Sequence, residues 1–284
     1  MAQHQQAAFP LEVFELIIDE LARKSDSISA VKACAVASRT FLPCCRKHLF
    51  KKIKLLPESE NSADVTVTQH GRATLRLTAP LVINSNLAQY VRILHICVRA
   101  RKHDDQLSAQ MLRRLQHIET LSIESRRRDP DDPYTNWNDI STGVRTALEG
   151  IITFPSLVEL HLKSIHEVPC YLLASARSLS HLSFLYVTFS IERPPEAQTL
   201  PIPHLKSLSF SNANAGITTL LQARLDGSPI VSFAHLKHLA LPGTRPMEFG
   251  PATEILRLAK SIESLALVGK PCYNSRLKFM TLIL

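Results

Sequence analysis

A short apolar pattern recurs along most of the chain and constrains its fold more than any other feature. The pattern is L-x-x-L-x-L with conservative apolar substitutions. Its instances are Val91-Leu94-Ile96, Ile118-Leu121-Ile123, Leu157-Leu160-Leu162, Leu179-Leu182-Phe184, Leu205-Leu208-Phe210, Leu236-Leu239-Leu241 and Ile262-Leu265-Leu267. Successive central leucines are separated by 27, 39, 22, 26, 31 and 26 residues. Seven ordered copies are hard to obtain by chance, although ordinary amphipathic strands are the alternative explanation.

The L-x-L part of each copy predicts a strand, because side chains two residues apart point to the same side of a strand. The residue three positions earlier is expected to turn inward as the chain enters that strand. One such unit cannot bury its own leucines, whereas stacked units form a continuous core. Since most of the steps lie in or near the range of about 20–29 residues typical of leucine-rich repeats, the spacing predicts an α/β leucine-rich repeat solenoid.

The segments between the copies have helical periodicity. The predicted helices are residues 104–116, 139–152, 217–225 and 252–260. Asp139 is the expected N-cap of the second helix. Strand-and-helix units stacked in this way curve into a horseshoe, with parallel strands on the concave face and helices outside. Charged and proline-containing insertions at 126–137 and 193–203 predict surface loops.

Three parts of the chain differ in character. They are a helical module at 9–50, a linking segment with a first irregular coil at 51–90, and the solenoid at 91–284. Near the end of the chain, Leu277, Met280 and Leu282 imitate another copy, but only 15 residues after Leu265. We therefore expect a solenoid that is incomplete at its C-terminus, as in a truncated gene product.

The side chains that alternate with the leucines are predicted to form the open face of the strands. Small and polar residues predominate there, so the backbone of a bound protein could approach closely. Because solenoids bind partners on their concave side, we predict that a target protein binds there; a solvated sheet face is the alternative for any single residue. The candidate target-binding residues are His95, Glu159, His161, His181, Ser183, Ser207, Ser209 and His238.

The N-terminal module is predicted to contain three short helices, at 11–23, at 29–37 and from Pro43 to Phe50. In the first helix, apolar residues recur every four positions opposite a series of acidic ones. About 40 residues bury little surface by themselves, so this module is expected to need a neighbour or a partner.

This module resembles an F-box. The resemblance rests on an apolar-proline opening followed by glutamate and spaced aliphatic residues, and on a later small-residue, serine, basic and aromatic run. These residues are Phe9, Pro10, Glu12, Val13, Ile17, Ile18 and Leu21, and then Ala37, Ser38, Arg39 and Phe41. The closing run at 46–50 and the strand-like Ile53-Lys54-Leu55 are similar to the F-box proteins of mushroom-forming fungi, which commonly join an F-box to leucine-rich repeats. A helical cap that covers the first coil of the solenoid is the alternative.

The resemblance implies a substrate-recognition adaptor of a ubiquitin ligase of the Skp-cullin-F-box type, with no bond chemistry of its own. The F-box would bind a Skp-family adaptor protein, and through it a cullin, while the repeats hold the target. The implied adaptor-binding residues are Phe9, Pro10, Val13, Ile17, Leu21 and Phe41. A leucine-rich repeat scaffold that never enters a ligase is the alternative.

Other classes of function lack their sequence signals. The sequence contains neither a glycine-rich nucleotide loop nor the closely spaced Cys and His pairs of a zinc site, so we expect an absence of cofactor and metal. The net charge of +8 is compatible with nucleic acid, but the basic clusters have no interleaved aromatic residues, and we therefore do not expect nucleic acid as a partner. Neither an apolar signal core at 1–8 nor a membrane span is predicted, so we expect a location in the cytoplasm, the nucleus or both, with unpaired cysteines.

Overall fold

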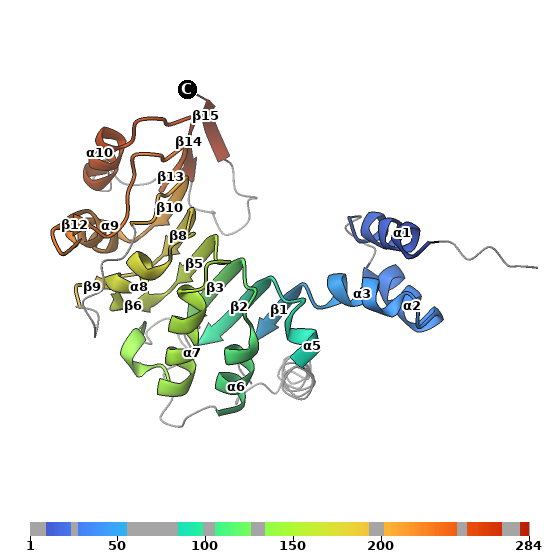
Figure 1. Cartoon of the computed structure of the whole chain (residues 1–284). Coiled ribbons are helices and arrows are strands. Elements are labelled where there is room, and N and C mark those ends of the chain that lie inside the picture. Colours follow the sequence, from blue (N-terminus) through green and yellow to red (C-terminus); the bar gives the residue numbers. More distant parts are fainter. Residues whose placement is uncertain are drawn as a thin grey trace, which may run out of the picture.

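The protein has an α/β fold around one large, mostly parallel sheet (Figure 1). The computed structural model describes residues 10–23, 28–55, 85–98, 106–125, 134–192, 202–242, 249–268 and 279–283. Phe9, Cys272, Leu277 and most of the two predicted surface loops, at 126–133 and 193–201, lie outside the described residues.

The sheet has nine strands in the order β1-β2-β3-β5-β8-β10-β13-β14-β15. The strands are β1 (Lys52–Leu55), β2 (Ile93–Val98), β3 (Thr120–Ser125), β5 (Glu159–Lys163), β8 (His181–Leu185), β10 (Ser207–Ser211), β13 (His238–Pro242), β14 (Ser264–Val268) and β15 (Phe279–Ile283). Each neighbouring pair from β1 to β14 is parallel. Spatial order therefore follows chain order, as it does when consecutive units stack.

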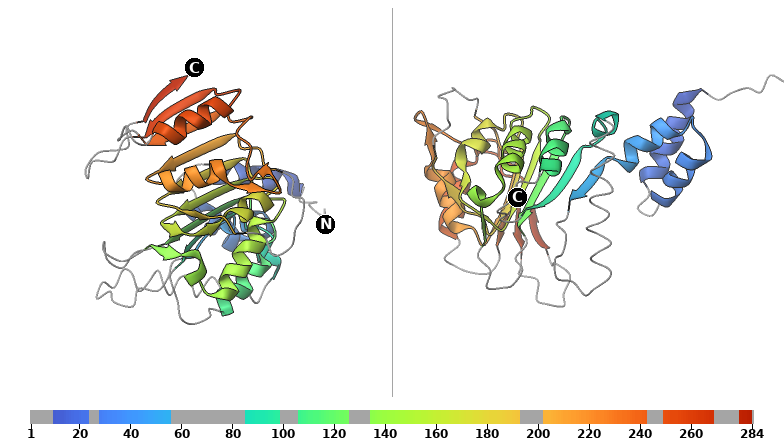
Figure 2. Two further views of the ribbon diagram at one scale, coloured as in Figure 1. Left: turned by 90° about the vertical axis from the view of Figure 1, so that its left-hand side faces the viewer. Right: turned by 90° about the horizontal axis from the view of Figure 1, so that it is seen from below.

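Helices cover one face of this sheet, and Figure 2 shows that all the described helices between β1 and β14 lie on that face. The covering helices are α5 (Ser85–Ala88), α6 (Gln106–Arg114), α7 (Thr142–Ile152), α8 (Cys170–Ser175), α9 (Asn214–Gln222) and α10 (Phe249–Leu258). Short ladders lie in the connections: β4 (Thr135–Asn136) with β6 (Ile165–His166), β7 (Val168–Pro169) with β9 (Phe189–Ser190), and β11 (Arg224–Leu225) with β12 (Ser228–Pro229). Within the described residues, no helix is long and apolar enough to cross a membrane.

The leucines of the sequence pattern occupy matched positions in neighbouring strands. One row across the sheet contains Ile53, Leu94, Leu121, Leu160, Leu182, Leu208, Leu239 and Leu265. These side chains are buried except for Leu265, which is half-buried on the last parallel strand. A fully buried leucine stabilises the folded state by roughly 1.5–3 kcal/mol relative to an exposed one, so this row is a main source of stability.

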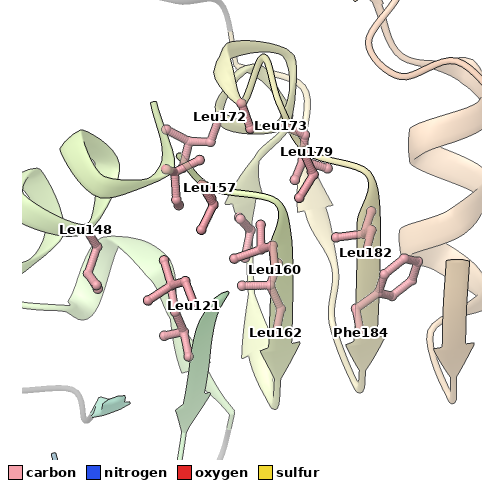
Figure 3. Packing of buried hydrophobic residues seen from close by; sticks show 14 of the residues in the cluster. Leu121, Leu148, Leu157, Leu160, Leu162, Leu172, Leu173, Leu179, Leu182 and Phe184 are labelled. Atoms are coloured by element: carbon pink, nitrogen blue, oxygen red, sulfur yellow. The ribbon is translucent and has the colours of Figure 1, made fainter. Parts of the chain in front are cut away.

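Successive units pack through these rows and through the covering helices. Figure 3 shows Leu121, Leu160 and Leu182 on three neighbouring strands, all on the side that faces the helices. Aromatic residues replace leucine in two units, where the rings of Phe184 and Phe210 stack with centroids 5.8 Å apart. Because the units share one continuous core, each unit depends on its neighbours for burial.

Three consecutive units also share one backbone conformation directly after the strand. Ser164, Tyr186 and Asn212 directly follow β5, β8 and β10, and their φ angles are 57°, 53° and 49°. A left-handed residue in this place turns the chain sharply out of the sheet at an energetic cost for residues other than glycine. Because three units have the same turn, the units resemble one another in backbone conformation as well as in the positions of their leucines.

The N-terminal helices α1 (Leu11–Arg23), α2 (Ile28–Ala37) and α3 (Leu42–Leu49) form a separate small cluster beyond β1 (Figures 1 and 2). The core of this cluster consists of Ile18, Val31, Cys44 and Cys45, and it is distinct from the core under the sheet. The three predicted helices of this region are therefore present with nearly the predicted bounds.

The structure corrects the prediction for the segment that ends at Trp137. We predicted a surface loop over 126–137, but Trp137 is fully buried and its Nε1 donates to Glu149 Oε1 at 3.4 Å. Asp139 is not the cap of the following helix, because it belongs to the 3-10 helix η1 (Trp137–Asp139) and α7 begins at Thr142 after Ser141. The helix predicted at 217–225 is shifted, since α9 already ends at Gln222.

The last strand is not a further copy of the repeat. β15 pairs with β14 in antiparallel orientation, with Leu282 opposite Leu265 and Met280 opposite Leu267. A parallel strand would need a crossover of about a dozen residues or more to return to the starting end of the sheet. β15 instead runs antiparallel to β14, which explains why the apolar alternation reappears only 15 residues after Leu265.

Candidate protein-binding surfaces

The open face of the sheet brings the predicted target-binding residues together in two rows. One row contains Lys52, Ile93, Thr120, Glu159, His181, Ser207, His238 and Ser264; the other contains Lys54, His95, Ser122, His161, Ser183, Ser209, Ala240 and Ala266. All eight predicted residues belong to these rows because they alternate with the buried leucines. His238 is exposed and the other seven are half-buried. Beyond the exposed Lys52, Lys54 and His238, a partner would therefore meet a low surface that carries hydrogen-bonding groups.

The carboxylates of this face are already paired within it. Thr120 Oγ1 donates to Glu159 Oε2 at 3.1 Å, and His161 Nε2 lies 3.1 Å from Glu159 Oε1. Lys163 Nζ lies 2.6 Å from Glu124 Oε1. These contacts hold side chains of neighbouring strands in fixed positions, and they leave fewer free acceptors for a partner.

His95 lies in the half-buried part of the face beside the two lysines of β1. Burial lowers the pKa of His95 below its usual value, and the charges of Lys52 and Lys54 lower that pKa further. Its Nε2 atom is buried and makes no hydrogen bond. His95 therefore contributes a neutral ring to this face at neutral pH. At the other end of the face, His238 Nδ1 and Ser264 Oγ lie 2.8 Å apart.

The N-terminal helices divide the predicted adaptor-binding residues between the surface and the interior. Pro10 and Ile17 are exposed and Val13 is half-buried. Leu21 and Phe41 instead pack against the core of the helical cluster, and the Phe41 ring lies 5.0 Å from that of Phe14. The sequence-based prediction assigned all of these residues to the adaptor interface and did not separate exposed residues from residues that pack against the core.

Three exposed apolar side chains of the same cluster were missed by the sequence interpretation. Leu16 is 70% exposed, Ile28 is 60% exposed and Val36 is 89% exposed, which compares with 51% for Ile17. Leu16 could have been identified from the sequence, because it is a large apolar residue outside the apolar stripe of α1 and is therefore not needed for the core. Several exposed apolar side chains on one small module are a common sign of an interaction site.

An ionic contact joins the first and third helices. Asp19 Oδ1 lies 2.6 Å from His48 Nε2, and Asp19 Oδ2 lies 3.3 Å from Lys47 Nζ. The hydrogen bond from His48, with a smaller effect of Lys47, lowers the pKa of the Asp19 carboxyl below its usual value. This contact fixes the orientation of α1 on α3, and hence the surface that α1 presents.

The described cysteines form no disulfide with one another. Cys44, Cys45 and Cys170 are buried, and Cys34 and Cys97 are half-buried. Burial raises the pKa of Cys170 to about 12, so its thiol stays protonated and unreactive at neutral pH. Within the part of the chain that the structure describes, no group of three or more His, Cys, Asp or Glu residues is arranged to hold a metal ion.

The open face of the sheet carries hydrogen-bonding groups, and the N-terminal helices carry exposed apolar side chains. Comparisons of the chain with protein-family models, with curated proteins and with solved structures find no match.

Proposed function

We propose that the protein is a substrate-recognition adaptor of a ubiquitin ligase of the Skp-cullin-F-box type. In this proposal the three N-terminal helices are an F-box, and the stacked strand-and-helix units are a leucine-rich repeat solenoid. The F-box binds a Skp-family adaptor and through it a cullin, the open face of the sheet binds the target protein, and the chain performs no bond chemistry itself.

The observation that carries the proposal is the set of exposed apolar side chains on a cluster whose own core is complete. Leu16, Ile17, Ile28 and Val36 remain exposed although Ile18, Val31, Cys44 and Cys45 already fill the interior. Covering one large aliphatic side chain is worth roughly 1.5–3 kcal/mol at most. Covering several of them would contribute favourably to a complex, and the F-box resemblance gives the class of that partner.

The test is co-purification with a Skp-family adaptor from a cell that expresses both proteins. Replacing Leu16 and Ile17 together by Asp should abolish the complex, because two carboxylates would be buried in an apolar interface. Leu21 is a poor site for this test, since it packs against the core of the helical cluster and its replacement would unfold the module.

The matched control is Leu107→Asp, which places a charge on an exposed leucine of α6, outside the N-terminal helices. It should leave adaptor binding unchanged. If the wild-type chain does not bind an adaptor at micromolar concentration, or if both variants bind like the wild type, the ligase proposal is wrong.

A scaffold outside any ligase is the second candidate, and one observation favours it. Leu21 and Phe41, two of the residues that the resemblance assigns to the adaptor interface, serve the interior of the helical cluster. A scaffold would retain target binding through the sheet face without the adaptor. Capture of a target by a chain that never binds an adaptor would support this second candidate.

A further inference from the structure

The N-terminal helices hold three cysteines in one small core, and the proposed function does not use their thiols. Cys34 lies in α2, and Cys44 and Cys45 lie in α3. Cys44 is 5% exposed and Cys45 is fully buried, and together with Ile18 and Val31 they make up the core of the helical cluster. Cys34 packs against this core from α2. Three nucleophilic groups therefore share the interior of a very small module.

The two thiols of α3 have different neighbours. Burial raises the pKa of both Cys44 and Cys45. The charges of Glu15 and Asp19, both on α1, raise the pKa of Cys44 further. For Cys45 the next largest cause is instead the charge of Cys34 on α2. Because adjacent side chains of a helix point about 100° apart, Cys44 is directed toward α1 and Cys45 toward α2.

Exposure decides which thiol of the α2–α3 pair reacts first. Cys34 is half-buried, whereas Cys45 is fully buried and its raised pKa keeps it protonated. A small core also opens locally at a lower cost than a large continuous one, so a small reagent reaches Cys34 first. Once Cys34 carries a leaving group, attack by Cys45 is intramolecular, which offsets the low thiolate fraction of Cys45.

We propose that Cys34 and Cys45 form a redox switch that reversibly links α2 to α3 through a disulfide bond. The oxidant is a low-molecular-weight disulfide of the glutathione type. The Cys34 thiol loses its proton and attacks one sulfur of the oxidant, so that a mixed disulfide forms and one small thiolate leaves. The Cys45 thiol then loses its proton and attacks the Cys34 sulfur, which releases the second small thiolate. The two small thiolates take up the two protons, and an excess of the reduced thiol reverses both steps.

The disulfide would change the rigidity of one apolar surface rather than its composition. The cross-link closes a loop over residues 35–44 and restricts the unfolded chain. It also fixes α2, which carries the exposed Ile28 and Val36, against α3. This inference does not rest on the ligase proposal, because its test measures thiol chemistry and not adaptor binding.

The experiment equilibrates the reduced full chain in a series of glutathione buffers, from reducing to oxidising. Free thiols are then alkylated, and the chain is digested with trypsin without reduction. Trypsin cleaves after Arg39, so Cys34 leaves in the peptide 33–39 and Cys45 in the peptide 40–46. We expect mass spectrometry to detect these two peptides linked by a disulfide in the oxidising buffers and separate in the reducing ones.

Alanine variants assign the second sulfur, because Cys44 and Cys45 share one peptide. Cys44→Ala is the matched control and should retain the linked peptides. Cys45→Ala should lose them and should stop at the mixed disulfide of Cys34 with glutathione, which also shows that Cys34 is still reached in that variant. In the oxidised wild type, we expect hydrogen exchange of α2 and α3 to be at least about tenfold slower than in the reduced chain.

Three results would overturn the proposal. The first is a wild type without linked peptides in the most oxidising buffer, a result that does not depend on the folding of any variant. The second is a link that survives in Cys45→Ala or disappears in Cys44→Ala, which would assign the bond to the wrong thiol. The third is linked peptides without slower exchange of α2 and α3, which would mean that the bond does not lock the two helices.

Discussion

Gly216 is the residue at which two neighbouring units approach most closely among the described glycines. A Cβ atom at this position would lie 2.5 Å from the carbonyl oxygen of Val187 and 3.4 Å from the ring of Phe189. The first contact is with backbone, which cannot move as a flexible side chain can. Helix α9 therefore packs on the preceding unit only because this position has no side chain.

We predict that Gly216→Ala lowers the free energy of unfolding by about 1–3 kcal/mol, as overpacked core substitutions do. Gly150 is the matched control, because it also lies in a helix and a Cβ there meets nothing within 4 Å. Gly150→Ala should raise stability by roughly 0.4–1 kcal/mol, since alanine restricts the unfolded chain. Urea denaturation followed by Trp137 fluorescence measures both changes. Equal effects of the two substitutions would contradict the close approach at Gly216.

At the scale of elements, the sequence predicted the strands better than it predicted the roles within α1. Alternation in a strand has a period of two, so Leu160 and Leu162 belong to one face while His161 belongs to the other. Residues four apart in a helix drift by about 40° per step, because a helix has 3.6 residues per turn. Val13, Ile17 and Leu21 therefore lie within about 80° of one another, and spacing alone did not separate the exposed Ile17 from Leu21, which packs against the core.

Other elements depended on contacts that single-sequence periodicity does not reveal. Trp137 is buried because β4 pairs with β6 and brings the end of the insertion back to the sheet. The direction of β15 likewise depends on which end of β14 the chain reaches, and apolar alternation is the same in both directions.

The contact between α1 and α3 predicts a pH-dependent stability of the N-terminal helices. The pKa of Asp19 is lowered in the folded state. Between the folded and the unfolded pKa, the carboxylate is therefore charged in the folded chain and mostly protonated in the unfolded chain. Its contribution is complete above the unfolded pKa and is lost as the pH falls through the folded pKa. We expect Asp19→Asn to cost about 1 kcal/mol at pH 6, a modest value because the Asp19 side chain is 32% exposed.

Hydrogen exchange of peptides from α1 and α3, corrected for the intrinsic rate at each pH, measures this effect. The difference between wild type and Asp19→Asn should shrink as the pH is lowered from about 6 to about 3. Glu20→Gln is the control on the same helix, because Glu20 pairs with the exposed Arg23 and such pairs contribute little. A difference that is the same at both pH values would show that the charge of Asp19 is not its source.

At the scale of the whole molecule, two separate hydrophobic cores imply two units of stability. The core of the N-terminal helices contains four buried residues around Ile18 and Val31, whereas the core under the sheet runs continuously from β1 to α10. Energetic effects usually add when residues are distant and share no partners. A protein built this way can present its N-terminal helices to one partner and its sheet to another without coupling the two.

The single tryptophan makes this independence measurable. Trp137 lies in the core under the sheet, so its fluorescence reports the unfolding of the repeating units and not that of the N-terminal helices. Leu208→Ala should lower the stability seen by Trp137 by about 2–5 kcal/mol, because it removes a fully buried leucine from the central row. Val31→Asp buries a charge in the other core and should remove the helicity of α1 to α3 in circular dichroism. It should change the transition seen by Trp137 by less than about 0.5 kcal/mol. If Val31→Asp shifts that transition as much as Leu208→Ala does, the N-terminal helices act as a cap of the first coil rather than as an independent docking module.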